Sequence, residues 1–545
     1  MLAVAGLAVL SLTAPAIYFA STFYSYGGSV PNIIVSGFNT SSADPGTVEE
    51  NWRDAFTLQP NNHIFRKSQT IRNTWNVTME ERAPDGVKKM VYLINGQFPG
   101  PTIEARSGDE LVIDVYNSIQ DSSNDGIAVH WHGLIMKGAN HMDGVVGLTQ
   151  CAIGPSERFT YRFRIDESQS GTFWYHAHAG LQRADGLFGG IVETGIIDKP
   201  TLYFDGIKIQ VTMQTRISSG LTLSISQGAM QLITVDGGSP VRNTPIATVM
   251  GVLYPGERMD LILDHCSQDI LPHQTQSNHT DKETKLTIAL DREYMRIENL
   301  ALARIQSFPL LWEGTVSENS SLERHESPSP TSNFLLSEAS GLPQWPGSDL
   351  THISIEKSVL YTAMQIRSSF YNRPVGILNH TSWMIADSKA KPLLALDPKE
   401  WSKATKQPSS IQNLQVPWYQ QSGKDKWIEL VLNNMDDTGH PFHLHGYEFY
   451  ILSVETTSRF GGYNPFDSDV VDLVKPKNLE SPLRKDTVYV PPRGFAILQF
   501  PLNNDGLWLF HCHALLHQAA GMGIVLHIGD IDPDVKNSSS NLCTA

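Results

Sequence analysis

Residues 507–523 read Leu-Trp-Leu-Phe-His-Cys-His-Ala-Leu-Leu-His-Gln-Ala-Ala-Gly-Met-Gly, and the interpretation of the whole chain starts from them. The first half of this stretch is apolar and aromatic, which is typical of a buried β-strand. Side chains alternate between the two faces of a strand, so His511 and His513 are predicted to point one way and Cys512 the other. One short strand can therefore serve two metal centres.

The residues that follow extend one of these two predicted centres. His517 and Met522 join Cys512 in a set of imidazole, thiolate and weak thioether of the kind that a blue copper site uses. A free cysteine is more often a small buried hydrophobe, and methionine often fills gaps in a core. Cys512, however, stands directly between two candidate ligands. The set lacks one histidine, for which His440 in a His-Pro-Phe-His-Leu-His-Gly segment is the candidate.

Pairs of histidines separated by one residue indicate the second centre. The chain contains 19 histidines in 545 residues, and a random placement would give fewer than one such pair. A single pair is equally well explained as a buried or surface histidine couple. Eight imidazoles suit copper or zinc, but zinc closes with four ligands and would leave half of them unused, whereas a cluster of three coppers uses all eight. The four pairs are His130 with His132, His176 with His178, His443 with His445, and His511 with His513.

Most of the chain is predicted to form β-structure. Short β-branched or aromatic runs alternate with Gly, Pro, Asn and Asp, which is typical of an antiparallel sandwich or barrel. A stretch dense in Ser, Pro, Glu and Asn separates the later strands from the earlier ones and is predicted to be a linker. The predicted divisions are a lead-in over 21–68, a first β domain over 69–199, a thinner second one over 200–303, the linker over 304–348, a third β domain over 349–530, and a mobile tail over 531–545.

The first 20 residues are predicted to be a secretory signal peptide or a signal anchor, because residues 1–43 carry no charged side chain and Leu2 to Ala20 is mostly apolar. A secretory route would permit glycosylation, and contact with a membrane is expected only if the segment remains as an anchor. The candidate glycosylation sites are Asn39, Asn76, Asn278, Asn319, Asn379 and Asn537.

Composition excludes some other classes of protein. The formal net charge of -15 argues against nucleic acid or anionic membrane surfaces as partners, because phosphate binding requires clustered Lys and Arg. Four cysteines are too few for a disulfide scaffold in a chain of this size. With Cys512 on a metal, Cys151, Cys266 and Cys543 remain, and three cysteines cannot all pair within one chain.

With these motifs in order and complete, the sequence resembles the multicopper oxidases, a family that includes laccases, ascorbate oxidase and ferroxidases. The resemblance covers residues 74–195 and 427–529 well and the middle poorly. It implies an all-β fold of tandem cupredoxin-like Greek-key β-sandwich domains, with the middle one reduced. It also implies four coppers per chain: a type 1 site of His440, Cys512, His517 and axial Met522; a type 2 copper on His130 and His443; and two type 3 coppers on His132, His176, His178, His445, His511 and His513.

The resemblance also implies an activity. Members of the family oxidise a small donor one electron at a time and reduce O2 to water. Asp143 matches an acidic residue that assists proton delivery, although an Asp before Gly is also a common turn residue. Where some relatives carry a second acid, this chain has Leu515. The expected donors are small phenolic pigment precursors, used by a secreted or cell-surface monomer. A ferroxidase acting on Fe(II), and a copper-binding protein with little turnover, are the alternatives.

Overall fold

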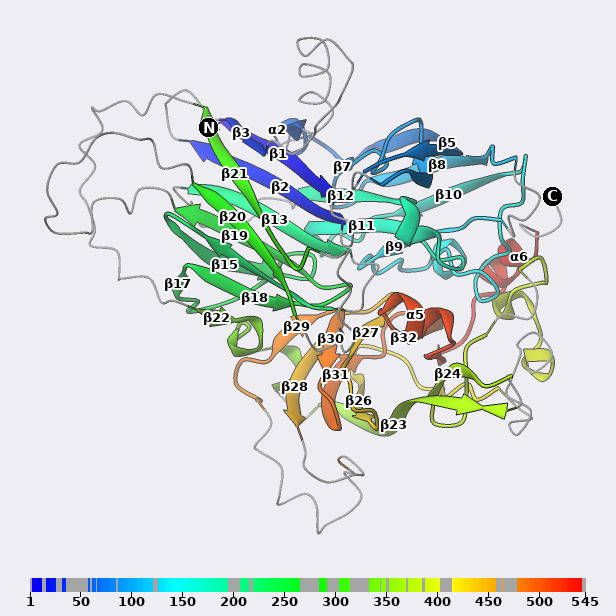
Figure 1. The fold of residues 1–545 in the computed structure, drawn as a ribbon. Coiled ribbons are helices and arrows are strands. Elements are labelled where there is room, and N and C mark those ends of the chain that lie inside the picture. Colours follow the sequence, from blue (N-terminus) through cyan, green and yellow to red (C-terminus); the bar gives the residue numbers. More distant parts are fainter. Residues whose placement is uncertain are drawn as a thin grey trace, which may run out of the picture.

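The part of the chain that the computed structural model describes consists mainly of β-strands arranged in six sheets, with few and short helices (Figure 1). The sheets form three pairs, which confirms the predicted all-β class of sandwich domains. The structure describes residues 2–11, 16–25, 32–35, 57–58, 61–64, 66–84, 87–120, 126–194, 206–214, 219–264, 284–291, 303–313, 333–343, 345–348, 352–368, 371–384, 388–401, 414–456, 463 and 478–541.

The first domain contains two four-stranded sheets, and the second of them contributes two histidine pairs. Alternating apolar residues bury Trp75, Trp131 and Tyr175 between the sheets, with Trp75 and Tyr175 rings 4.5 Å apart. The order in one sheet is β10 (Arg158–Arg164), β8 (Glu110–Asn117), β5 (Thr70–Arg82) and β6 (Lys89–Ile94), and in the other β7 (Ile103–Arg106), β12 (Phe188–Thr194), β11 (Gly171–Ala177) and β9 (Val129–His132).

The third domain repeats this plan and contributes the other two pairs. Its hydrophobic core is continuous with that of the first domain, so the two domains present their histidine-bearing sheets to each other across a closed interface. One sheet contains β24 (Arg373–Leu378), β23 (Ser354–Arg367), β26 (Lys426–Asn434), β31 (Gly494–Pro501), β28 (Phe449–Thr456) and β29 (Leu483–Lys485), and the other β25 (Trp418–Tyr419), β33 (Gly523–Ile528), β32 (Gly506–Cys512), β27 (His440–Leu444) and β30 (Thr487–Val490).

The middle pair of sheets draws strands from two distant parts of the chain (Figure 1). Its hydrophobic core is separate from that of the other domains. Residues 206–313 and 334–335 supply β13 (Gly206–Gln214), β14 (Leu221–Ile225), β15 (Ala229–Val235), β16 (Ser239–Pro240), β17 (Ile246–Ala247), β18 (Val249–Leu253), β19 (Arg258–Asp264), β20 (Lys285–Leu290), β21 (Ile305–Glu313) and β22 (Phe334–Leu335). The N-terminal region supplies β1 (Leu2–Ser11), β2 (Ala16–Ser25), β3 (Asn32–Val35) and β4 (Thr57–Leu58).

The N-terminal strands occupy the segments predicted as a targeting signal and a lead-in. β2 pairs with β13 in antiparallel register from Ala16 opposite Gln214 to Tyr24 opposite Gly206, and β1 pairs with β2. The short middle segment of the sequence is thus extended by strands that precede the first domain. Among the helices that the structure describes, none is long and apolar enough to span a membrane.

Two predicted boundaries need correction. Strand β21 lies inside the segment predicted as a linker, where it pairs with β20, so the middle domain extends past residue 303. The tail predicted to be mobile contains helix α6 (Pro533–Asn541), and the Ser539 hydroxyl on it donates to the Thr149 carbonyl at 2.7 Å. The α6 segment is mostly polar and lacks the apolar periodicity that would have revealed it. The remaining short helices are α2 (Asn61–Ile64), η1 (Asn140–Met142), η2 (Gln182–Asp185), η4 (Leu336–Glu338), η5 (Pro346–Ser348), η7 (Leu393–Ala395), η8 (Pro398–Glu400) and α5 (Leu515–Ala519).

The two cysteines that the structure describes differ in their bonding state. Cys512 is free and fully buried, whereas Cys151 is disulfide-bonded. The other two cysteines of the sequence, Cys266 and Cys543, lie outside the described residues.

Candidate metal centres

Strand register brings the histidine pairs together. In the first domain β9 and β11 are antiparallel neighbours, with His130 opposite His176. In the third domain β27 and β32 are neighbours, with His443 opposite His511. Residues two apart share a face of a strand. Each of these two strand pairs therefore presents four imidazoles on one side of its sheet.

Across the domain interface the eight imidazoles form three groups. In each group one ring nitrogen per residue lies within 4.8 Å of the others, and every ring is buried. Rings from the two domains stack directly: the centroids of His130 and His445 are 3.8 Å apart, and those of His132 and His443 are 3.7 Å apart. The groups are His130 with His132 and His443; His132 with His176 and His513; and His178 with His445 and His511. We call these eight residues the trinuclear cluster, after the three groups that they form.

Unpaired nitrogens inside the cluster fit metal ions. A buried ring nitrogen without a hydrogen-bond partner is costly in a folded protein. Two nitrogens that do have a near neighbour, Nε2 of His445 and Nε2 of His511, face each other at 3.1 Å, an arrangement that a shared cation would stabilise. The nitrogens without a partner are Nε2 of His130, His176 and His443, Nδ1 of His513, and both ring nitrogens of His132.

The surroundings keep these imidazoles neutral, as metal ligation requires. Burial, together with the neighbouring imidazoles, lowers the pKa of His445 to about 3. Burial is also the largest cause of the lowered pKa values of the other affected rings, which are those of His132, His176, His178, His443, His511 and His513.

Asp143 lies directly behind two of the rings. Its Oδ2 is 2.8 Å from Nδ1 of His445, and its Oδ1 is 3.1 Å from Nδ1 of His130, whose Nδ1 also approaches the Asp143 carbonyl at 2.8 Å. Burial by itself raises the pKa of this carboxyl, but the two imidazoles outweigh burial and hold the pKa well below its usual range. The carboxylate therefore fixes the tautomer of both rings and turns their Nε2 atoms inward.

A second acidic residue, Asp486, lies against two rings on the other side, His443 through Nδ1 and His132 through Nε2, and could not be identified from the sequence. Its backbone carbonyl accepts from Nδ1 of His443 at 2.9 Å, and its Oδ1 lies 3.4 Å from Nε2 of His132. The Thr487 hydroxyl donates to the same Oδ1 at 2.8 Å. Asp486 lies alone between β29 and β30, so no motif in the sequence marks it.

The predicted type 1 ligands lie around Cys512. Its Sγ is 3.8 Å from Nδ1 of His440 and 3.6 Å from Nδ1 of His517, and the two imidazole nitrogens are 3.1 Å apart. Met522 is fully buried, and its backbone carbonyl accepts from the Cys512 amide at 2.9 Å. Burial raises the pKa of the Cys512 thiol, so binding of a metal there would release a proton.

Asp436 holds His440 in place and was also missed. Its Oδ2 lies 2.9 Å from Nε2 of His440, and the Met364 amide donates to that oxygen at 2.8 Å. The Asp436 side chain is 16% exposed. It is therefore a carboxylate that touches both a candidate metal ligand and solvent.

Two polar residues, Gln518 and Arg183, lie at the edge of the cluster nearest to α5. Leu515 is buried and has no group that transfers protons, as predicted. Gln518, one turn further along the helix, places Nε2 3.3 Å from Nε2 of His178. Arg183 of η2 donates to the His513 carbonyl at 2.7 Å. Neither Gln518 nor Arg183 was identified from the sequence, because single polar residues on short helices have no distinctive spacing.

The candidate glycosylation sites differ in accessibility. Asn76 and Asn537 are exposed. Asn379 is half-buried, and its side chain accepts from the Tyr361 amide at 2.9 Å. Asn39, Asn278 and Asn319 lie outside the described residues.

Comparisons with known proteins agree with this fold. Multicopper oxidase family models match residues 76–198 and residues 391–531, which carry all eight histidines of the cluster. Each of these two regions of the chain therefore matches a multicopper oxidase domain.

Several relatives align over most of the chain. Laccase-2 of Botryotinia fuckeliana is 27% identical, with 88% of this chain and 84% of the relative covered. An iron transport multicopper oxidase of Epichloe festucae is 27% identical, with 83% and 75% covered, and an L-ascorbate oxidase of Nicotiana tabacum is 25% identical, with 85% and 91% covered.

Solved structures show the same fold. Fet3p, a multicopper oxidase that functions in iron import, superimposes with a TM-score of 0.63 at 20% identity, covering 86% of this chain and 92% of Fet3p. The laccase from Botrytis aclada superimposes with a TM-score of 0.58 at 20% identity, covering 89% and 93%.

Proposed function

We propose that the chain is a laccase-like oxidase that holds four coppers and couples one-electron oxidation of small phenolic donors to reduction of O2. Bound copper would supply the one-electron chemistry at the type 1 site and the reduction of O2 to two waters at the trinuclear cluster. The reaction balances when four donors each give one electron and four protons are taken up. We expect the four coppers on the His, Cys and Met residues predicted above.

The observation that best supports this proposal is the continuity of one strand. Cys512 belongs to the type 1 group, and its neighbours His511 and His513 belong to the trinuclear cluster. The two groups are therefore joined by a few covalent bonds through a fully buried backbone. Such a connection serves electron transfer between centres and would have no use in a protein that only stores copper.

The other residues of the site would position ligands and protons. Asp143 would hold His130 and His445 and accept or return protons at its carboxylate, which is within hydrogen-bond reach of both rings. Asp436 would orient His440 and bind donors that present a proton or a positive charge. The buried apolar core around the strand excludes water from the path.

Copper content, colour and oxygen uptake test the proposal together. Purified protein should contain four coppers, show the thiolate-to-copper absorption band that makes such proteins blue, and consume oxygen when given a diphenol. Cys512→Ser should abolish the blue absorption and the oxygen uptake. A blue band that persists in Cys512→Ser would contradict the type 1 assignment, and full copper loading without oxygen uptake would favour a copper-binding protein with little turnover.

A ferroxidase is the second candidate, and the partly exposed carboxylate of Asp436 against His440 favours it. A carboxylate is a hard ligand that suits Fe(II) and would connect it to the type 1 group. Asp436→Asn should then lower kcat/KM for Fe(II) much more than for a diphenol. Asp437→Asn is the matched control, because Asp437 is exposed and ion-paired with Arg493 away from His440. Equal losses for both donors would favour the phenolic substrate.

We also propose that the protein is a secreted or cell-surface monomer, glycosylated where its sequons are exposed, with a role in forming pigments. The fungal laccase relative supports the phenolic class of donor. Glycosidase treatment of protein from a secreting host tests the modification, since a loss of mass is expected.

A further inference from the structure

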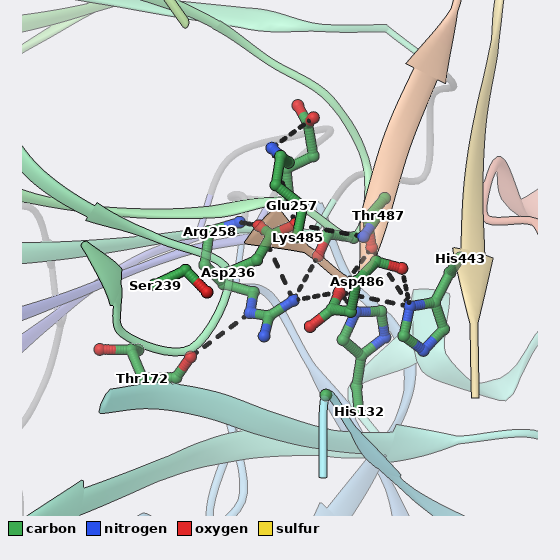
Figure 2. A network of polar contacts seen from close by, with 12 residues as sticks. His132, Thr172, Asp236, Ser239, Glu257, Arg258, His443, Lys485, Asp486 and Thr487 are labelled. Carbon is green, nitrogen blue, oxygen red and sulfur yellow. Dashed lines mark hydrogen bonds and ion pairs between the residues drawn. The ribbon is translucent and has the colours of Figure 1, made fainter. Parts of the chain in front are cut away.

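A buried network of charges joins the middle domain to the third domain beside the trinuclear cluster (Figure 2). The Lys485 ammonium pairs with Glu257 at 2.7 Å and lies 3.6 Å from Asp236. The Arg258 guanidinium donates to Asp486 Oδ1 at 2.6 Å. The middle domain supplies Asp236, Glu257 and Arg258, whereas Lys485 and Asp486 come from the third domain.

Arg258 is held in one position by its surroundings. It is the first residue of β19 and is 1% exposed. Its Nη1 also donates to the Gly256 carbonyl at 3.2 Å, its Nε donates to the Thr172 carbonyl at 3.3 Å, and its backbone amide donates to Asp236 Oδ1 at 2.8 Å. The side chain therefore bridges the middle domain, the first domain through Thr172, and the third domain through Asp486.

The space around the guanidinium and Asp486 is full. A Cβ added at Gly133, next to His132, would lie 2.5 Å from Nη2 of Arg258 and 2.9 Å from Oδ2 of Asp486. A Cβ at Gly256 would lie 3.0 Å from the His513 ring. The loop before β19 thus packs directly against the cluster.

Asp486 connects Arg258 to the ligands. Its carboxylate lies 3.3 Å from Nδ1 of His443 and 3.4 Å from Nε2 of His132, whose rings are stacked. This carboxylate can hold both rings only while it stays ionised and at a fixed distance from them. A buried charge without a partner is strongly destabilising, so the carboxylate needs a cation beside it. In the part of the chain that the structure describes, Arg258 is the cation that contacts this carboxylate.

We propose that Arg258 is a positioning residue for the trinuclear cluster: it fixes the Asp486 carboxylate against His132 and His443. This inference rests on the proposed oxidase function, and it gives the middle domain a role in the metal centre itself. Arg258 acts through Asp486 and touches neither a ligand nor a substrate.

The test compares Arg258→Met with Glu257→Gln in copper-loaded protein. Glu257 is a matched control because it is also buried, makes an interdomain ion pair with Lys485, and lies one residue from Arg258. Arg258→Met should alter the type 2 copper signal in electron paramagnetic resonance and weaken copper retention against a chelator by roughly 10- to 100-fold, with the blue absorption unchanged. Glu257→Gln should leave the type 2 signal as in the parent protein.

Two outcomes would overturn the inference. One is a parent-like type 2 signal and copper retention in Arg258→Met. The other is an equal change in Glu257→Gln, which would mean that the network only docks the domains. If Arg258→Met does not fold, Arg258→Lys and Asp486→Asn replace it. The inference then requires that the double variant change the type 2 signal and copper retention no more than Asp486→Asn alone does. Parent protein that binds copper but consumes no oxygen would refute the oxidase function, and the type 2 signal would still test Arg258.

Discussion

Asp143 and His445 are 302 positions apart in the sequence, in different domains, and yet Oδ2 of the one lies 2.8 Å from Nδ1 of the other. The contact ties the first domain to the third at the trinuclear cluster. It also makes Asp143 the nearest carboxylate to two of the rings.

Replacement of Asp143 by Asn should lower the turnover number of the copper-loaded enzyme about 100-fold and leave the blue absorption intact. The amide keeps the shape of the side chain, but it neither carries the charge nor exchanges protons as a carboxylate does. Asp114→Asn is the control, since Asp114 also sits in the first domain and accepts a hydrogen bond from Thr160. Oxygen-electrode assays over a range of pH provide the measurement. A parent-like turnover number in the Asp143 variant would show that the carboxylate has no part in proton delivery.

Among the residues that the structure describes, Leu515 is the residue on the α5 side of the cluster where a second acid was considered. Leu515→Glu should raise the rate of the oxygen-reducing step at neutral pH relative to Leu515→Gln, because a buried carboxyl has a raised pKa and can carry a proton there. Single-turnover reoxidation of reduced enzyme isolates this step. The neutral Gln variant controls for packing, and equal rates in the two variants would indicate that protons arrive by another route.

Gly144 is predicted to tolerate no side chain. It has a φ of +82°, and a Cβ there would lie 1.8 Å from the Val129 carbonyl oxygen, beside His130 and Asp143. Gly144→Ala should therefore cost more than about 3 kcal/mol of unfolding free energy. Gly138, with a φ of +67° and nothing within 4 Å of a Cβ, is the control, and Gly138→Ala should cost only about 1 kcal/mol. Denaturant unfolding compares the two, and similar losses would contradict the predicted clash.

Asp109 should make the stability of the first domain depend on pH. Burial raises the pKa of this carboxyl, but the Arg66 guanidinium and the amides of Gln69 and Arg106 outweigh burial and lower the pKa below its usual value. The unfolded chain then binds the proton more readily than the folded one. The stabilisation is therefore complete above the unfolded pKa of about 4 and is lost as the pH falls through the folded pKa.

Asp109→Asn should accordingly lower the unfolding free energy by about 2 kcal/mol at pH 7, and the difference from the parent protein should shrink below about pH 4. Glu110→Gln is the control, because it removes a nearby but more exposed ion pair with Arg162. It should change the unfolding free energy by less than about 0.5 kcal/mol. Urea titrations at several pH values measure both, and a difference that stays constant with pH would exclude the ionic explanation.

The grouping of the predicted ligands was predictable because their spacing is local. Histidines two apart share a strand face whatever the rest of the chain does, so His511 and His513 could be assigned from seven residues of context. Asp486 and Arg258 could not be predicted in this way. They are 228 positions apart, and their contact depends on how two domains pack. The pairing of β2 with β13 was unpredictable for the same reason, since an apolar stretch at the start of a chain has the composition of a targeting signal as well as that of a strand.

The histidines of the third domain are the last members of each group to be synthesised. Each of the three groups of the trinuclear cluster combines histidines near residue 130 or 176 with one or two from residues 443–513. Because a ribosome adds residues one at a time, a nascent chain that ends before residue 443 holds two, two and one of the three members of these groups. Under the proposed function, copper loading of this cluster would therefore follow the synthesis of the third domain.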